Sequence, residues 1–448
     1  MIEDYGILSL FPTALVLVLA VVTKKAVMPL IVGAVVAFVM LDGIFFPSGL
    51  ISATYTVFKG DTLPMIVMVT FLFGALIQLF ERSHAAHAFS VSVNRHVKSS
   101  KQSLFAAWFM GLALFIDDFL NAIVVGTTMR RTTDRYGVPR EMLAYITDVT
   151  AAPMAVMLPF SAWAVFFMSL FVELGLTDFT GMSEFDMYWH VIPFIFYAIV
   201  AIGIVPLVIT GIIPALGQMK DAYKKVPSTV ATESADEPSS AAGKAKAYHF
   251  LVPILILVVV TFATNGDVTQ GALISLIVTA VVFWAQKIMS KEEIAKAMQA
   301  GIVSMLPVTG IIFFSLLLVE GNAQLGTAEF VVATIAPFMS AEMIPFATFC
   351  VVSALAFSTG SFFGTAAVVM PIIVPLVLST GCNVFLAMGA TISGAVFGSH
   401  CCFFGDATVL TASSCQITPI RHALTQLPYG IISWAIASVL YIALGFVL

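Results

Sequence analysis

Residues 111–121 read Gly-Leu-Ala-Leu-Phe-Ile-Asp-Asp-Phe-Leu-Asn and lie in the middle of an apolar segment, residues 104–129. This segment is long enough to enter a lipid bilayer, whose hydrocarbon core is about 30 Å thick. A carboxylate at that depth costs about 2.5–3.5 kcal/mol even on lenient insertion scales, so it persists where it faces a cavity, an ion or a proton path. Asp117 and Asp118 therefore predict a membrane protein that moves an ion.

The composition of the chain supports a membrane location. Of its 448 residues, 60% are hydrophobic and 10% are charged, whereas about 25% of the residues of a soluble domain are charged. The net charge of −5 gives no indication of nucleic-acid binding. Uninterrupted apolar runs predict membrane-spanning helices at residues 6–23, 26–41, 63–80, 189–215, 249–265, 271–287, 301–319 and 427–448.

Four further apolar segments are interrupted by Gly, Pro, Ser, Thr or Asp. Unwound backbone at membrane depth is tolerated where it lines a cavity or is buried in protein. We predict two re-entrant hairpins, which return to the side from which they enter, at residues 104–129 and 343–378. We predict two broken helices: residues 141–175, unwound at 148–153, and residues 384–412, unwound at 394–405.

The distribution of basic residues sets the topology. With the N-terminus outside and both hairpins re-entrant, every lysine and arginine except Lys59 lies on the inner side, as the positive-inside rule requires. Residues 217–247 are hydrophilic and rich in lysine, serine and alanine, and predict a flexible cytoplasmic linker. The linker divides a first transmembrane repeat, residues 1–216, from a second, residues 248–448.

The two predicted repeats have opposite orientations in the membrane. The interval from residue 6 to residue 117 in the first repeat equals the interval from residue 249 to residue 360 in the second. Inverted repeats place the substrate site near the midplane, where discontinuous helices meet. The sequence thus predicts an all-α polytopic membrane protein built as an inverted-topology repeat, with two re-entrant hairpins and two broken helices.

The polar residues of the first repeat are the candidates for binding a cation or a proton. Asp118 and Asn121 are three residues apart and share a helix face, whereas Asp117 does not, so one of the two carboxylates binds the ion while the other caps a helix or titrates. Carboxylate, hydroxyl and carbonyl oxygens are the ligands that hard cations prefer. We predict cation and proton binding at Asp117, Asp118, Asn121, Asp148, Thr150 and Asp406.

Small polar residues of the second repeat are candidates for lining the substrate path. They are Ser358, Thr359, Gly360, Ser361 and Thr365 of the second hairpin, and Ser399, His400 and Thr408 of the second broken helix. His400 stands beside two cysteines, but no paired ligand spacing accompanies them, so we expect no resident metal and no cofactor.

Most of the sequence resembles the NhaC-type sodium/proton antiporter family. The residues that carry the resemblance are 117–126, 129–130, 133–135, 140–141, 143–146 and 148–153 in the first half, and 364–365, 371, 394–398, 400, 406 and 426–428 in the second. The resemblance implies a secondary transporter of the ion-transporter superfamily in a bacterial cytoplasmic (inner) membrane. It also implies hairpins, broken helices and inverted repeats, and a substrate domain that moves like an elevator within a homodimer.

Two positions depart from the family pattern. An acidic residue is usual where Ser399 stands, and a tryptophan is usual where Phe362 or Phe363 stands. We therefore keep two hypotheses: exchange of sodium for protons through the intramembrane aspartates, or sodium- or proton-coupled transport of a small organic acid or amino acid. An enzyme is not expected, because Phe403 replaces the first glycine of the Gly-x-Gly-Asp signature of intramembrane aspartyl proteases.

Overall fold

The computed structural model describes residues 5–23, 25, 27–59, 62–94, 97–225, 244–335, 339–403 and 405–448, which form helices and no strands. The helices before residue 226 are α1 (Phe11–Thr23), α2 (Val27–Asp42), α3 (Phe46–Lys59), α4 (Thr62–Arg82), α5 (Ala85–Asn94), α6 (Ser100–Ala113), α7 (Asp118–Arg135), α8 (Arg140–Ala155), α9 (Ala162–Glu173), α10 (Leu176–Thr180), α11 (Glu184–Val191), α12 (Phe196–Thr210) and α13 (Gly217–Lys225). Those after residue 243 are α14 (Tyr248–Ala263), α15 (Val268–Ala285), α16 (Lys291–Gln324), α17 (Thr327–Ile335), α18 (Ile344–Thr359), α19 (Phe362–Thr380), α20 (Val384–Cys401), α21 (Asp406–Ser414) and α22 (Pro419–Gly445).

Several helices are long and apolar enough to cross a membrane. Among the described residues there are seven, or up to eight if Glu184–Phe194 and Phe196–Thr210, bent by 53°, form one span. Apolar side chains on α14 and α15 face outward, with Leu255 61% and Val281 54% exposed. These surfaces fit a lipid environment. The protein is therefore an integral, multi-pass membrane protein, as the sequence predicts.

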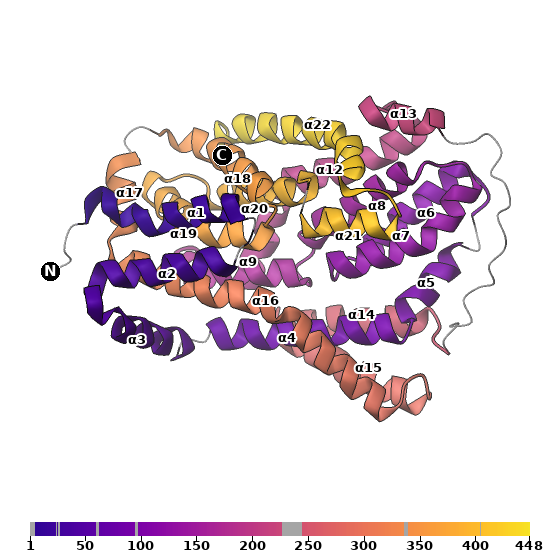
Figure 1. The fold of residues 1–448 in the computed structure, drawn as a ribbon, viewed down its shortest axis with the longest axis horizontal. Coiled ribbons are helices and arrows are strands. Elements are labelled where there is room, and N and C mark those ends of the chain that lie inside the picture. Colours follow the sequence, from indigo (N-terminus) through magenta and orange to yellow (C-terminus); the bar gives the residue numbers. More distant parts are fainter. Residues whose placement is uncertain are drawn as a thin grey trace.

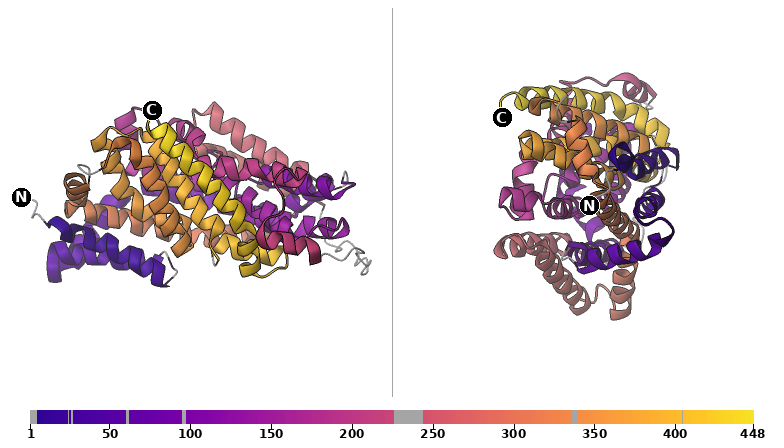
Figure 2. Two further views of the ribbon diagram at one scale, coloured as in Figure 1. Left: turned by 90° about the horizontal axis from the view of Figure 1, so that it is seen from above. Right: turned by 90° about the vertical axis from the view of Figure 1, so that its left-hand side faces the viewer.

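The helices are arranged in two groups stacked across the long axis of the molecule. Figure 1 shows α2, α3, α4, α14, α15 and α16 below a second group that contains α6 to α9, α12 and α18 to α22, and Figure 2 shows the same arrangement from two other sides. Within the lower group α16 packs against α4, α2 and α3. The groups meet where α4 packs on α9 and α16 packs on α19.

Glycines permit the closest helix contacts. A Cβ on Gly74 of α4 would overlap the Gly301 carbonyl oxygen of α16. A Cβ on Gly398 of α20 would overlap the Ala356 Cβ of α18, and Gly394 one turn earlier packs on Val352 of the same helix. Small residues let helix backbones approach in a membrane, where dispersion contacts replace the hydrophobic effect. The α18–α20 contact holds the second hairpin against the second broken helix.

Each predicted hairpin is a pair of helices joined by a short turn, and the re-entrant course of each pair stays a prediction. The first consists of α6 and α7, which pack together and are separated by the turn at residues 114–117. The second consists of α18 and α19, separated by Gly360 and Ser361. Gly360 has φ of +66°, which favours glycine. Figure 1 shows the two hairpins toward opposite ends of the long axis; their relation by an inverted repeat stays a prediction.

The first broken helix is interrupted later than predicted. Residues 148–153 do not unwind: they lie within α8, which ends at Ala155. The break falls at residues 156–161, where the Tyr188 hydroxyl donates to the Val156 carbonyl oxygen (2.8 Å) and Ser161 caps α9. Pro153 stays inside α8 because proline is compatible with helical φ and removes one hydrogen-bond donor, the one that would pair with the Val149 carbonyl.

The second broken helix is interrupted at the end of the predicted window. Residues 394–401 remain helical in α20, and α21 begins at Asp406. The glycines that predicted unwinding serve instead as the contact surface with α18. The interpretation of glycine as a helix breaker was therefore wrong at Gly394 and Gly398.

The predicted linker begins with a helix. Its first nine residues form α13, which packs on α22 and α8. The Leu216 backbone N–H just before α13 donates to the Tyr429 hydroxyl of α22 (3.0 Å). Residues 226–243 lie outside the described residues, and the division into two repeats at this stretch stays a prediction.

The α18–α20 contact yields a stability test. Gly398→Ala would place a methyl group into Ala356, and overpacking of this kind costs about 1–3 kcal/mol. We expect the unfolding temperature of the detergent-solubilised protein to fall by several degrees, measured by thermal unfolding. The matched control is Gly203→Ala in α12, where no atom lies within 4 Å of the new Cβ. An equal effect of both substitutions would contradict the packing interpretation.

Candidate functional site

The tip of the first hairpin holds two buried carboxylates. Asp117 is 5% exposed and caps α7, accepting the Leu120 backbone N–H at 2.7 Å. Asp118, 4% exposed, accepts the indole N–H of Trp163 from α9 at 3.1 Å. No described lysine or arginine forms an ion pair with either carboxylate. Their negative charge is therefore stabilised by neutral donors and by the N-terminus of α7.

Asn121 ties the hairpin to the neighbouring helix. Its amide nitrogen donates to the Gly111 carbonyl of α6 (2.7 Å) and to the Thr150 carbonyl of α8 (2.6 Å). Its side-chain oxygen is buried and has no partner. Asn121 therefore fixes the two hairpin arms and α8 relative to one another, one turn after Asp118.

A second carboxylate centre lies between α8 and α22. Asp148 is fully buried, and its Oδ2 accepts hydrogen bonds from His422 Nε2 (3.0 Å) and from Gln426 Nε2 (2.9 Å). Its other oxygen, Oδ1, has no hydrogen-bond partner among the residues that the structure describes. A buried carboxylate with one oxygen unpaired costs free energy that a cation or a proton would recover.

The network around Asp148 extends to α20 and α12. The amide nitrogen of Gln426 also donates to the His400 carbonyl oxygen at the end of α20. The His400 ring is fully buried, and its Nδ1 is 2.7 Å from the Tyr197 hydroxyl of α12. One connected set of polar side chains thus joins four helices inside the upper group.

The two carboxylate centres have different partners but adjoin each other. Asn121, one turn after Asp118, donates to the Thr150 carbonyl, two residues after Asp148. At 1.5 Å per residue, Asp148 is about 12 Å along α8 from Arg140. The predicted first-half residues therefore form a hairpin-tip centre around Asp118 and a neighbouring α8–α22 centre around Asp148.

The tip of the second hairpin brings several predicted residues together. The hydroxyls of Thr359 and Thr365 are 3.0 Å apart, and Ser361 caps α19 by accepting the Gly364 N–H. Gly360 and Ser399 are brought together at Gly405, whose Cβ, if present, would lie 3.4 and 3.3 Å from their carbonyl oxygens.

Ser358 is not part of this group. It is exposed and bonds back to its own helix at the Ala354 carbonyl.

Trp163 connects the tips of the two hairpins. Its indole N–H bonds Asp118 of the first hairpin, and its ring lies 3.7 Å, centroid to centroid, from Phe362 of the second. Phe363 is also close, at 5.5 Å. Trp163 therefore contacts both the Asp118 carboxylate and the second hairpin.

The remaining predicted residues have simpler surroundings. The Thr150 hydroxyl donates to the Ile146 carbonyl (2.9 Å) of its own helix, so it is already engaged. Thr408 is fully buried and its hydroxyl has no partner. Asp406 is the first residue of α21, and its side chain lies outside the described structure.

Sequence reasoning missed four residues of the two centres, namely Trp163, Tyr197, His422 and Gln426. His422 and Gln426 gave a usable signal, because two polar residues four apart share one face of an otherwise apolar helix. Trp163 and Tyr197 could not be recognised as site residues from the sequence, because each is an aromatic residue in an apolar run.

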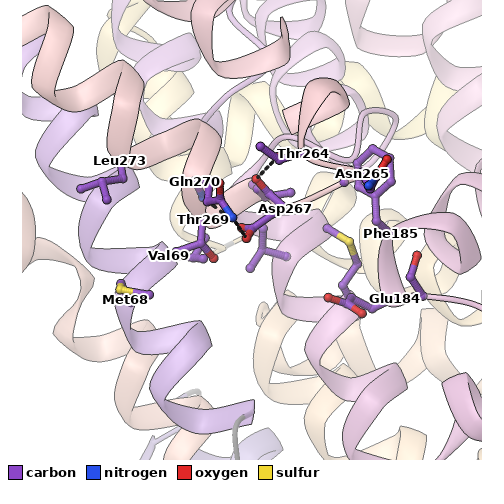
Figure 3. A pocket seen from close by; sticks show the side chains of 15 residues that line it. Met68, Val69, Glu184, Phe185, Thr264, Asn265, Asp267, Thr269, Gln270 and Leu273 are labelled. Atoms are coloured by element: carbon purple, nitrogen blue, oxygen red, sulfur yellow. Dashed lines mark hydrogen bonds between the residues drawn. The ribbon is translucent and has the colours of Figure 1, made fainter. Parts of the chain in front are cut away.

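A separate cavity of about 450 Å³ lies between α4, α9, α11 and the α14–α15 turn. Figure 3 shows Glu184 and Asp267 on its walls, with Asp267 bonded to Gln270. None of the predicted site residues lines it. The cavity is therefore distinct from both carboxylate centres.

Comparisons with known proteins show the family of this chain. The Na+/H+ antiporter family model matches residues 154–446, and the chain therefore belongs to the Na+/H+ antiporter family. The matched region begins after Asp118 and Asp148. An uncharacterized protein of Haemophilus influenzae is 25% identical, with 98% of this chain and 91% of that protein covered.

Two solved structures have a similar fold. The YdaH transporter of Alcanivorax borkumensis has a TM-score of 0.68 at 16% identity, with 91% of this chain and 90% of that chain covered. MtrF of Neisseria gonorrhoeae, which illuminates a class of antimetabolite efflux pumps, has a TM-score of 0.62 at 14% identity, with 91% and 86% covered. The family match identifies a membrane transporter and confirms the resemblance to sodium/proton antiporters.

The Trp163 contact yields a transport test. Trp163→Phe keeps an aromatic ring against Phe362 but removes the donor to Asp118. Because a hydrogen bond to a charged group contributes about 1.5–3 kcal/mol, we expect the transport rate in proteoliposomes to fall about tenfold or more. The control is Trp189→Phe, at a side chain that is 47% exposed on α11. Unchanged transport in a folded Trp163→Phe protein would rule out the proposed importance of this bond.

Proposed function

We propose that this protein exchanges sodium ions for protons across a bacterial cytoplasmic (inner) membrane through its intramembrane aspartates. The observation that carries the proposal is the pairing of Asp118 and Asp148 with neutral or titratable donors, while no described lysine or arginine neutralises them. A carboxylate that is not paired with a lysine or arginine can bind a transported cation or proton instead. Membership of the Na+/H+ antiporter family supports sodium and protons as those mobile charges.

Competition for the same carboxylates is sufficient for exchange. A site that holds either a sodium ion or a proton is neutralised, whereas the empty site carries a charge that is costly to move through a low-dielectric region. The loaded site therefore changes sides and the empty site does not. Each inward proton is then matched by an outward sodium ion, or the reverse, according to the gradients.

The two hairpins supply the connection between occupancy and movement. Asp118 lies at the N-terminus of α7, and its charge is held by Trp163, whose ring contacts Phe362 of the second hairpin. Protonation of Asp118 weakens that bond, because a neutral carboxyl group is a poorer acceptor than a carboxylate. We propose that, of the two carboxylates at the hairpin tip, Asp118 is the one whose occupancy changes, and that Asp117 stays a helix cap. Assembly as a homodimer stays a prediction.

The second candidate function is sodium- or proton-coupled transport of a small organic acid or amino acid. The N-terminus of α19 favours it, because Thr359, Ser361 and Thr365 gather hydroxyls where a helix dipole attracts a carboxylate. The similarity in fold to MtrF, which is associated with antimetabolite efflux pumps, supports an organic substrate as well. A screen of amino acids and carboxylates for sodium-dependent uptake separates this function from plain exchange.

The exchange proposal predicts a direction of pH change. Proteoliposomes loaded with sodium and a trapped pH dye, diluted into sodium-free buffer, should acidify inside, because protons enter as sodium leaves. Asp118→Asn removes the titrating oxygen and should abolish the acidification. We expect the rate to fall about 100-fold or more, because the exchange step requires this group.

Asp178→Asn is the matched control, since Asp178 is exposed on α10 and distant in sequence from both centres. A sodium gradient that moves no protons in the wild-type protein would overturn the exchange proposal. Acidification that persists in Asp118→Asn would remove Asp118 from it.

A further inference from the structure

We propose that the side-chain oxygen of Gln426, together with Asp148 Oδ1, forms the oxygen ligands of a sodium site at the contact of α8 with α22. This inference rests on the proposed exchange function and names the residues that hold the cation. Gln426 was not among the residues predicted from the sequence. The site lies about 12 Å along α8 from Arg140, at the second carboxylate centre and not at the hairpin tip.

The orientation of the Gln426 amide is fixed by its neighbours. Its nitrogen faces Asp148 Oδ2 at 2.9 Å and the His400 carbonyl oxygen. The carbonyl oxygen can only accept a hydrogen bond, and so can Asp148 Oδ2 when the carboxylate is ionised, which is the form that binds a cation. The amide nitrogen must therefore occupy this position, which leaves the amide oxygen on the opposite side.

The same reasoning applies to the other members of the centre. His422 Nε2 lies 3.0 Å from Asp148 Oδ2 and must carry a proton to donate there. With the donors of Gln426 and His422 both directed at Oδ2, the atoms that remain without partners are Asp148 Oδ1, Gln426 Oε1 and His422 Nδ1. In the neutral form of the imidazole, all three are acceptors.

A buried group of acceptors without donors fits a cation. Asp148, His422 and Gln426 are each 0% exposed. Leaving one buried acceptor unpaired costs about 1–3 kcal/mol. Sodium is a hard cation that is matched by carboxylate and amide oxygens, so the two oxygens rather than the ring nitrogen are its ligands. Both oxygens belong to the two groups that share the 2.9 Å hydrogen bond between Gln426 Nε2 and Asp148 Oδ2.

Asp148 is the group that gives the proposed site its negative charge. The neighbouring polar groups are His400 and Cys401 of α20 and Tyr197 of α12, which contact one another. Arg421 is one residue before His422, and it pairs with Glu141 at the start of α8. A sodium ion would therefore neutralise one carboxylate charge.

The test compares substitutions of Gln426 in sodium-driven proton movement and in equilibrium binding of radioactive sodium. Gln426→Met keeps the length of the side chain and removes both the amide oxygen and the donor to Asp148. We expect its KM and Kd for sodium to rise at least tenfold. Gln426→Glu keeps an oxygen in place and loses the donors, and we expect a sodium KM no higher than wild type in alkaline buffer.

Ser433→Ala is the matched control on α22, because that buried hydroxyl bonds to the Tyr429 carbonyl of its own helix. A folded Gln426→Met protein with the wild-type KM for sodium would overturn the site. If Gln426→Met does not fold, a Gln426→Glu protein with a tenfold higher KM would overturn it as well. A wild-type protein without sodium-driven proton movement would instead show that the exchange proposal itself is wrong.

Discussion

The burial of carboxylates inside a membrane is the constraint on which the rest of the structure depends. Asp118 and Asp148 carry charges in a region where an unpaired charge is costly. The chain meets this cost with neutral or titratable donors: Trp163 for Asp118, and His422 with Gln426 for Asp148. The donors come from α9 and α22, so the hairpin and the broken helices must pack as they do for the carboxylates to be tolerated.

Interrupted helices make these contacts available. An uninterrupted helix satisfies its own backbone but offers no helix end within the membrane, whereas the breaks after Leu114, Val156 and Gly360 place helix N-termini there. Side chains close each break, as when Tyr188 donates to the Val156 carbonyl. Asn121 then joins α7 to α8, so the two carboxylate centres belong to one packed unit.

The hairpins could be predicted from the sequence, because aspartate or glycine in the middle of an apolar segment is costly unless the backbone turns there. The first break was predicted too early, since Asp148 and Pro153 look like breakers but are accommodated within α8. Gly394 and Gly398 were misread, because the same residue type serves unwinding and close packing, and the difference depends on whether another helix approaches. The donors to the carboxylates, Trp163 above all, could not be predicted, because they depend on contacts between residues that are far apart in the sequence.

The most direct measurement is the number of protons released when the purified, detergent-solubilised protein binds sodium. Stopped-flow mixing with sodium chloride in weak buffer, with a pH indicator and a choline chloride control, reports this number without vesicles. If sodium and protons compete for the intramembrane carboxylates, sodium binding will release protons, and less so in alkaline buffer where the carboxylates are already ionised. Sodium binding without proton release at any pH would contradict competition at shared carboxylates.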